Sequence, residues 1–97
     1  MEDWNSLHEV LEAACHEPDE VTARRAVRAA ELVAATAGEP TDELSGEDRA
    51  WAEMHGIPPS ELVELACRSM KCVAALSEEW HAQLNDLRYR LGDVAAA

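Results

Sequence analysis

The most restrictive feature of the sequence is the stretch "AVRAAELVAATAGEP" at residues 26–40, which predicts a helix and its end. Alanine has the highest helix propensity, and Gly38 followed by Pro40 is a typical helix stop. We therefore predict a helix over residues 18–37. Its buried stripe consists of small aliphatic residues, namely Ala23, Ala26, Val27, Ala30, Val33, Ala34 and Ala37. Side chains this small let neighbouring helices approach closely, so we expect this helix in the middle of a core.

The composition favours an all-α fold for the rest of the chain. Hydrophobic residues make up 47% of the sequence, with no Phe, one Tyr and three Trp. A core of Ala, Leu and Val suits packed helices better than a sheet, which favours β-branched and aromatic residues. A chain of 97 residues is long enough for one modest core. We predict a single helical domain over residues 1–97, folded as a compact bundle of four or five helices.

Local signals place the other helices. Asn5 or Ser6 can cap a first helix, and Ser45 can cap a short helix that holds Trp51 and ends at Gly56. From residue 61 onward, apolar positions recur every three or four residues, at Leu62, Leu65 or Ala66, Ser69, Val73, Leu76, Trp80, Leu84, Leu87 and Leu91.

An unbroken helix of that length would be too long for the domain. A continuous helix of about thirty residues is roughly 45 Å long at 1.5 Å per residue, whereas a globule of this size has a radius of gyration of about 13 Å. Either the C-terminal helix bends near Ser77, where "SEE" is typical of a helix start, or a partner covers the overhang. We favour the bend, and we expect Gly92 to end the helix so that residues 91–97 form a frayed tail.

The strong negative charge restricts the possible partners. Twenty acidic residues face eight basic ones, for a net charge of −12. Residues 39–53 hold six carboxylates and Arg49 as their one basic residue. Such a surface repels nucleic-acid phosphates and anionic membranes and attracts basic protein surfaces. We therefore expect neither direct nucleic-acid binding nor membrane binding; the alternative reading is that the acidity only keeps a small protein in solution.

The cysteines and the N-terminus point to the cytoplasm. Three cysteines form a poor disulfide framework, and reduced thiols are the simpler interpretation. The start "MEDWNSLHEV" has neither the basic nor the apolar region of a secretory signal, and the apolar stretches are too short to span a bilayer. We expect a cytoplasmic protein.

The residues that could carry chemistry lack the spacing of a known site. Cys67 and Cys72 lie about 140° apart on a helix, and the sequence has no CxxC and no HxxxH pattern. Cys15 could be paired with His81 or His55 by folding, but nothing marks it as activated. The sequence therefore predicts no metal site, no cofactor and no enzymatic activity.

The three tryptophans have different expected roles. Trp80 is in phase with the leucines and is expected in the core, while Trp51 is expected to close one end of the bundle. Trp4 lies beside Glu2 and Asp3. It could be an exposed interface anchor, or it could fold back on the first helix as a hydrophobic staple.

Three stretches carry a family resemblance. "AVRAAELVAATAGEP", "LVELACRSMKCVAAL" and "EEWHAQLNDLRYRLG" resemble the small bacterial proteins grouped as domain of unknown function 4259, over roughly residues 7–91. In that family an alanine-rich helix precedes a long leucine helix and a terminal helix containing Trp. The glycine-rich, aromatic N-terminal segment of the family is missing here. The family has no established activity, so the resemblance implies a helical arrangement and assigns no residue a function.

The sequence as a whole predicts a small acidic protein-binding module. The leading hypothesis is an inhibitor of the immunity-protein or antitoxin type, whose carboxylates block the basic cleft of a toxin or nuclease-like partner. Two alternatives stay open: a phage-encoded mimic of nucleic-acid phosphates that inhibits a host nuclease, and an enzyme or sensor that uses Cys15, Cys67 or Cys72. The protein could be a monomer or a homodimer. The residues expected to bind the partner are Trp4, Glu39, Asp42, Glu43, Glu47, Asp48 and Glu53.

Overall fold

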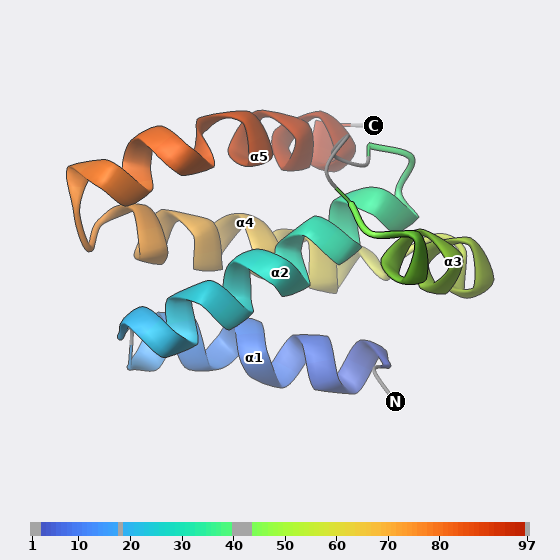
Figure 1. Cartoon of the computed structure of the whole chain (residues 1–97), viewed down its shortest axis with the longest axis horizontal. Coiled ribbons are helices and arrows are strands. Elements are labelled where there is room, and N and C mark those ends of the chain that lie inside the picture. Colours follow the sequence, from blue (N-terminus) through green and yellow to red (C-terminus); the bar gives the residue numbers. More distant parts are fainter. Residues whose placement is uncertain (1–2, 18, 40–43, 97) are drawn as a thin grey trace.

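Five α-helices follow one another in the computed structural model, which describes residues 3–17, 19–39 and 44–96 (Figure 1). They are α1 (Trp4–His16), α2 (Glu20–Thr36), α3 (Gly46–His55), α4 (Ser60–Ala74) and α5 (Glu78–Ala96). The described residues include no strand, and the principal extents of the molecule are 33 × 25 × 24 Å. The prediction of an all-α bundle of four or five helices is confirmed.

The helix α2 lies at the centre of the bundle, as its small side chains predict. It packs against α1, α4, α5 and α3. Because several helices contact it, its buried surface is wider than the single predicted stripe. Ala29 and Leu32 are also buried, whereas Val27 and Ala37 lie only half-buried at the margin. The helix ends at Thr36, and Gly38 follows with a φ of 93°, in the left-handed region that glycine adopts without strain.

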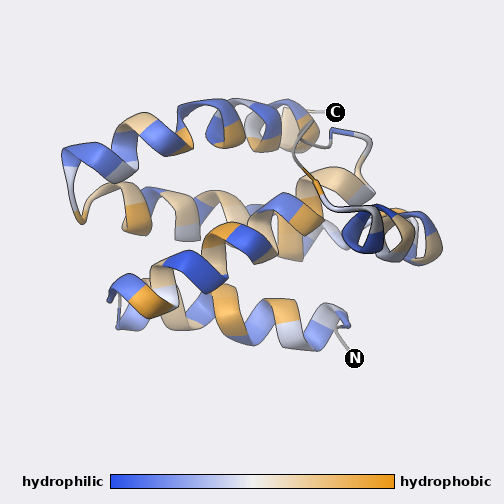
Figure 2. Cartoon of the chain, in the orientation of Figure 1, coloured by the Kyte–Doolittle hydropathy of each residue, from blue (hydrophilic) through white to orange (hydrophobic). Residues whose placement is uncertain are grey.

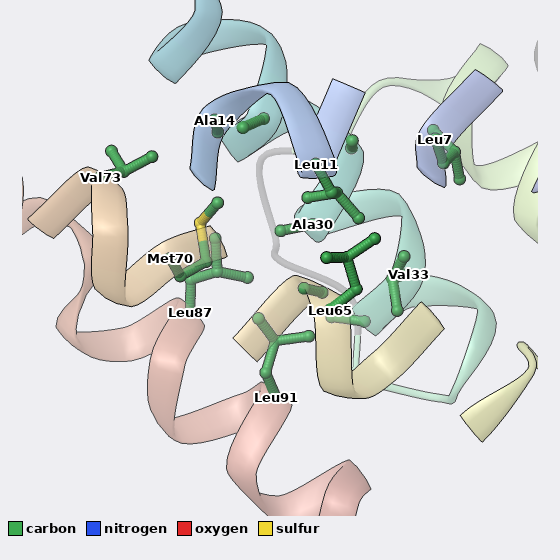
Figure 3. Packing of buried hydrophobic residues seen from close by; sticks show 14 of the residues in the cluster. Leu7, Leu11, Ala14, Ala30, Val33, Leu65, Met70, Val73, Leu87 and Leu91 are labelled. Carbon is green, nitrogen blue, oxygen red and sulfur yellow. The ribbon is translucent and has the colours of Figure 1, made fainter. Parts of the chain in front are cut away.

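Leucines and one methionine from the outer helices fill the space around α2. Hydrophobic residues recur between hydrophilic ones along each helix (Figure 2). The buried set brings Leu11 of α1 together with Met70 of α4 and Leu87 of α5 (Figure 3). Ser69 is fully buried in the same region, and its hydroxyl donates a hydrogen bond to the carbonyl oxygen of Leu11. This bond satisfies the hydroxyl and explains why a polar residue fits an apolar series.

The long apolar series is interrupted near Ser77, where the sequence predicts a bend, and the interruption separates two helices. The helix α4 ends at Ala74, α5 begins at Glu78, and the Ser77 hydroxyl oxygen accepts the backbone N–H of Trp80 at 3.3 Å. The chain then reverses, so that α5 lies antiparallel against α4 and no rod projects from the molecule (Figure 1). The prediction that Leu76 is buried is wrong, because the residue lies in the turn and is exposed.

Both ends of the described chain differ from the predictions. At the N-terminus the cap is Asp3 rather than Asn5 or Ser6, and its carboxylate accepts the Ser6 N–H at 2.8 Å. At the C-terminus the predicted frayed tail is wrong, because α5 continues through Gly92 to Ala96. Val94 packs against the edge of the core one turn after the buried Leu91, which gives this last turn a hydrophobic contact. In the described residues, no helix is long and apolar enough to cross a membrane.

Candidate protein-interaction surface at the α3 end

The short helix α3 projects from one end of the bundle (Figure 1). The Ser45 hydroxyl oxygen caps it by accepting the N–H of Asp48 at 3.1 Å, as the sequence predicts, and Gly56 ends it with a φ of 69°. Among the described helices, α2 is the one whose backbone lies close to α3. Within α3, all of which the structure describes, Ala52 is the one buried residue. Most of its surface therefore faces outward.

An aromatic cluster attaches α3 to α1. The rings of Trp51 and His55 stack with their centroids 3.9 Å apart, and the Trp4 ring meets both edge-on at 5.5 Å and 5.7 Å. Edge-to-face pairs of this kind stabilise beyond their buried area. Trp4 is half-buried. It is thus neither the exposed anchor nor the staple on its own helix that the sequence suggested; it holds α3 in place.

The carboxylates predicted to bind a partner have different surroundings. Glu47 and Glu53 are exposed on α3. Asp48 forms an ion pair with Arg28 at 3.0 Å, and its side chain is only 19% exposed. Glu39 is half-buried directly after α2. Asp42 and Glu43 lie outside the described residues.

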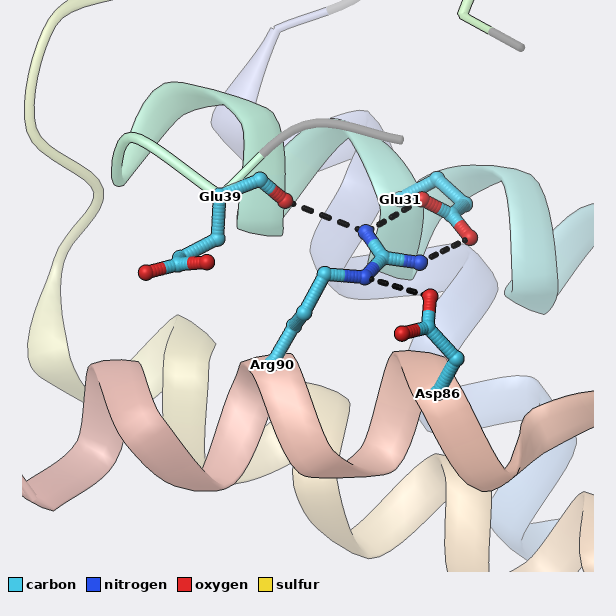
Figure 4. A network of polar contacts seen from close by, with 4 residues as sticks. All are labelled: Glu31, Glu39, Asp86 and Arg90. Atoms are coloured by element: carbon cyan, nitrogen blue, oxygen red, sulfur yellow. Dashed lines mark hydrogen bonds and ion pairs between the residues drawn. The ribbon is translucent and has the colours of Figure 1, made fainter. Parts of the chain in front are cut away.

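Arg90 fixes the segment that follows α2 against α5 (Figure 4). Its guanidinium donates two hydrogen bonds of 2.9 Å to the carboxylate of Glu31, one of 2.8 Å to Asp86 and one of 3.0 Å to the carbonyl oxygen of Glu39. The hydrogen bonds to Glu31 raise the pKa of Arg90 above its already high ordinary value. Arg90 is therefore a structural residue whose charge is already matched, and it contacts Glu39 through the backbone carbonyl rather than the carboxylate.

Two exposed apolar residues lie beside these carboxylates, and the sequence alone did not indicate a binding role for either. Among the large hydrophobic residues that the structure describes, Ile57 and Met54 are the most exposed, at 89% and 83%. Ile57 stands between Gly56 and Pro58, a segment interpreted only as a helix boundary. Met54 belongs to the short helix predicted around Trp51, and Ile57 directly follows it. The available signal was that no buried position is predicted for either residue.

Ile57 borders an apolar hollow of about 450 Å³, which we call the α2–α5 groove. The end of α2, the start of α4 and the end of α5 form its walls, and its lining residues are Thr36, Ala37, Ile57, Pro58, Ser60, Val63, Glu64, Val94 and Ala95. A second hollow of about 390 Å³ shares Ala37 and Val94 with it and adds Glu39, Asp93 and Ala96. An exposed apolar surface with an acidic margin thus covers this end of the molecule.

No thiol is among the described residues that line these two hollows. The Cys15 sulfur is 3.5 Å from the Ser69 hydroxyl oxygen, whereas His55 belongs to the aromatic cluster and His81 lines a hollow with Cys67. Burial raises the pKa of Cys67, and burial together with a hydrogen bond from the protonated Cys72 thiol to Cys15 raises the pKa of Cys72. A raised pKa keeps a thiol protonated and weakly nucleophilic, so the geometry does not favour a reactive cysteine. In the described part of the chain, no group of three or more His, Cys, Asp or Glu is placed to hold a metal ion.

Comparisons of the chain with protein-family models, with curated proteins and with solved structures each give no match. The resemblance to domain of unknown function 4259 therefore stays a prediction.

Proposed function

We propose that this protein is a cytoplasmic protein-binding module that captures a basic partner protein with its α3 end. By this proposal it acts as an inhibitor of the immunity-protein or antitoxin type and covers a basic surface of a toxin or nuclease-like protein. The observation that carries the proposal is the exposure of Met54 and Ile57 next to the carboxylates of Glu47 and Glu53.

The two kinds of residue have complementary roles in binding. Exposed carboxylates steer a basic partner toward the surface and raise the association rate, an effect that salt screens. Apolar side chains that become buried supply much of the affinity, because a few central anchors dominate most interfaces. Met54 and Ile57 contribute almost nothing to the core, since most of their surface is in water in the free protein. They are available as anchors.

The test compares capture by two matched variants of the immobilised protein. The first changes the α3 end by Glu47→Gln, Glu53→Gln, Met54→Ser and Ile57→Ser. The control makes equivalent changes at exposed positions on other helices, Glu9→Gln, Glu79→Gln, Val21→Ser and Tyr89→Ser. Asp48 is left unchanged in both, because its ion pair with Arg28 gives it a structural role.

We expect the wild type and the control variant to retain the same basic protein from an extract of the host, and the α3-end variant to lose it. Retention should fall as salt is raised. Equal retention of that protein by the two variants would contradict the proposal, and so would retention that is independent of salt.

A further inference from the structure

We propose, building on the proposed function, that the α2–α5 groove receives a basic amphipathic helix of the partner, with its apolar side chains in the groove and its Lys or Arg residues on the margin. The groove lies directly beside Ile57. The groove is thus the part of the surface that anchors the partner, and its lining determines the chemistry of the segment that the groove accepts.

The size and lining of the groove fit apolar side chains. Ala37, Ser60 and Ala95 are short, and they leave space between the ends of α2 and α5 that none of the described side chains fills. A volume of about 450 Å³ lies within the range of about 300–1,000 Å³ that is typical of sites enclosing an organic group. Val63 and Val94 make its walls apolar. The groove can therefore bury large aliphatic or aromatic side chains.

The margin of the groove selects positive charge. Glu64 lines the groove itself, and Glu39 and Asp93 line the adjoining hollow. None of the described residues that line either hollow is Lys, Arg or His. Arg90 lies close to Glu39 but already binds Glu31 and Asp86. The complementary ligand is thus apolar along its centre and basic at its edges.

A helix of the partner satisfies both requirements better than a second copy of this chain. An amphipathic helix presents apolar residues at i, i+3, i+4 and i+7 with basic residues on either side of that stripe. Two copies of a chain with a net charge of −12 repel each other. The open side of the groove, next to the projecting Ile57, gives the helix further apolar contact.

A model peptide tests the inference without the partner. The probe is a helical peptide of leucine and lysine, about 14 residues long, with its leucines on one face; a second peptide carries glutamate in place of lysine. Binding of each to the full-length protein is measured by isothermal titration calorimetry at low and high salt. The test variant is Ala95→Trp, which fills the groove, and its matched control is Ala82→Trp at another exposed alanine of α5.

We expect the lysine peptide to bind the wild type and Ala82→Trp equally and to bind Ala95→Trp about tenfold more weakly. The glutamate peptide should not bind. The double variant Glu64→Gln/Asp93→Asn should weaken binding at low salt and flatten its salt dependence. Circular dichroism checks that each variant keeps its helices, and Ile57→Ser offers a second test at a position that folding does not need.

Three results would overturn the inference: no binding of the lysine peptide by the wild type, equal affinity of Ala95→Trp and Ala82→Trp, or a concentration-dependent dimer that Ala95→Trp abolishes. The last result would identify a second copy as the occupant. If Ala95→Trp binds the peptide normally while the α3-end variant fails to capture the partner, the groove inference fails and the proposed function stands. If the α3-end variant also captures the partner normally, both fail.

Discussion

The neighbouring helices α2 and α3 differ in how much of their surface the fold uses. Seven of the 17 residues of α2 are buried, and the helix contacts all four other helices. One of the ten residues of α3 is buried, and the Met54 side chain in its last turn is 83% exposed. The two helices therefore have different roles: the small residues of α2 bring the bundle together, whereas Glu47, Glu53 and Met54 of α3 are exposed and available for binding. Changes in α2 should therefore alter stability, and changes in α3 should alter binding.

The largest expected effect is overpacking of α2. Ala30 is fully buried, and Ala30→Leu adds volume where helices approach closely. We expect the free energy of unfolding to fall by about 1–3 kcal/mol. The matched change Ala50→Leu at an exposed position of α3 should stay within about 0.5 kcal/mol of the wild type. Urea denaturation of both variants checks the difference. Similar decreases in the free energy of unfolding for Ala30→Leu and Ala50→Leu would contradict the contrast between the two helices.

A smaller loss is expected from the ion-pair network between α2 and α5. Arg90→Ala leaves the carboxylate of Glu31, which is 20% exposed, without its two hydrogen bonds. We expect the free energy of unfolding to fall by about 1–2 kcal/mol, since hydrogen bonds to charged groups stabilise more than neutral ones. Asp86→Ala removes an exposed partner of the same arginine and should cost less than about 0.5 kcal/mol. Thermal unfolding that ranks Asp86→Ala as the more damaging change would contradict this description of the network.

The helix caps predict a modest loss of stability in acid. Hydrogen bonds from Ser6 and Thr22 lower the pKa of Asp3 and Asp19, respectively, below the ordinary value of 3.8. A carboxylate with a lowered pKa in the folded state stabilises the fold above its ordinary pKa, and this stabilisation is lost as pH falls through the lowered pKa. The double variant Asp3→Asn/Asp19→Asn keeps capping side chains without a titrating group. Its Tm should fall less than that of the wild type between pH 5 and pH 2, and an equal fall would show that these caps do not contribute.

The smallest expected effect on stability belongs to the α3 end. Met54→Ser/Ile57→Ser should change the free energy of unfolding by no more than about 0.5 kcal/mol, because both side chains are already in water. Urea denaturation provides the measurement. A loss of more than about 1 kcal/mol would show that these side chains support the fold, and they would then no longer be candidate binding anchors.

The parts of this structure that the sequence predicts are those encoded by neighbouring residues. Helix ends at Gly38, Ser45, Gly56 and Ser77 follow from capping and backbone preferences that act within a few residues. The alanine-rich composition also indicates a central α2. By contrast, the prediction of a frayed tail beyond Leu91 is wrong, because the packing of Val94 against the core supports the helix there.

The candidate surface depends on residues far apart in the chain. Arg90 reaches Glu31 across 59 positions, and the α2–α5 groove combines three segments. No local pattern reports such pairings. For the same reason, the sequence could list exposed carboxylates but could not distinguish the paired Asp48 from the exposed Glu47 and Glu53.

Native-state hydrogen exchange tests the contrast between the two helices most directly. We expect amides of α2 at residues 26–33 to exchange only through global unfolding. Amides of α3 at residues 50–55 should exchange through a local opening whose free energy is lower by about 2 kcal/mol or more. Equal opening free energies in α2 and α3 would contradict the account, because α3 would then be as firmly part of the core as α2.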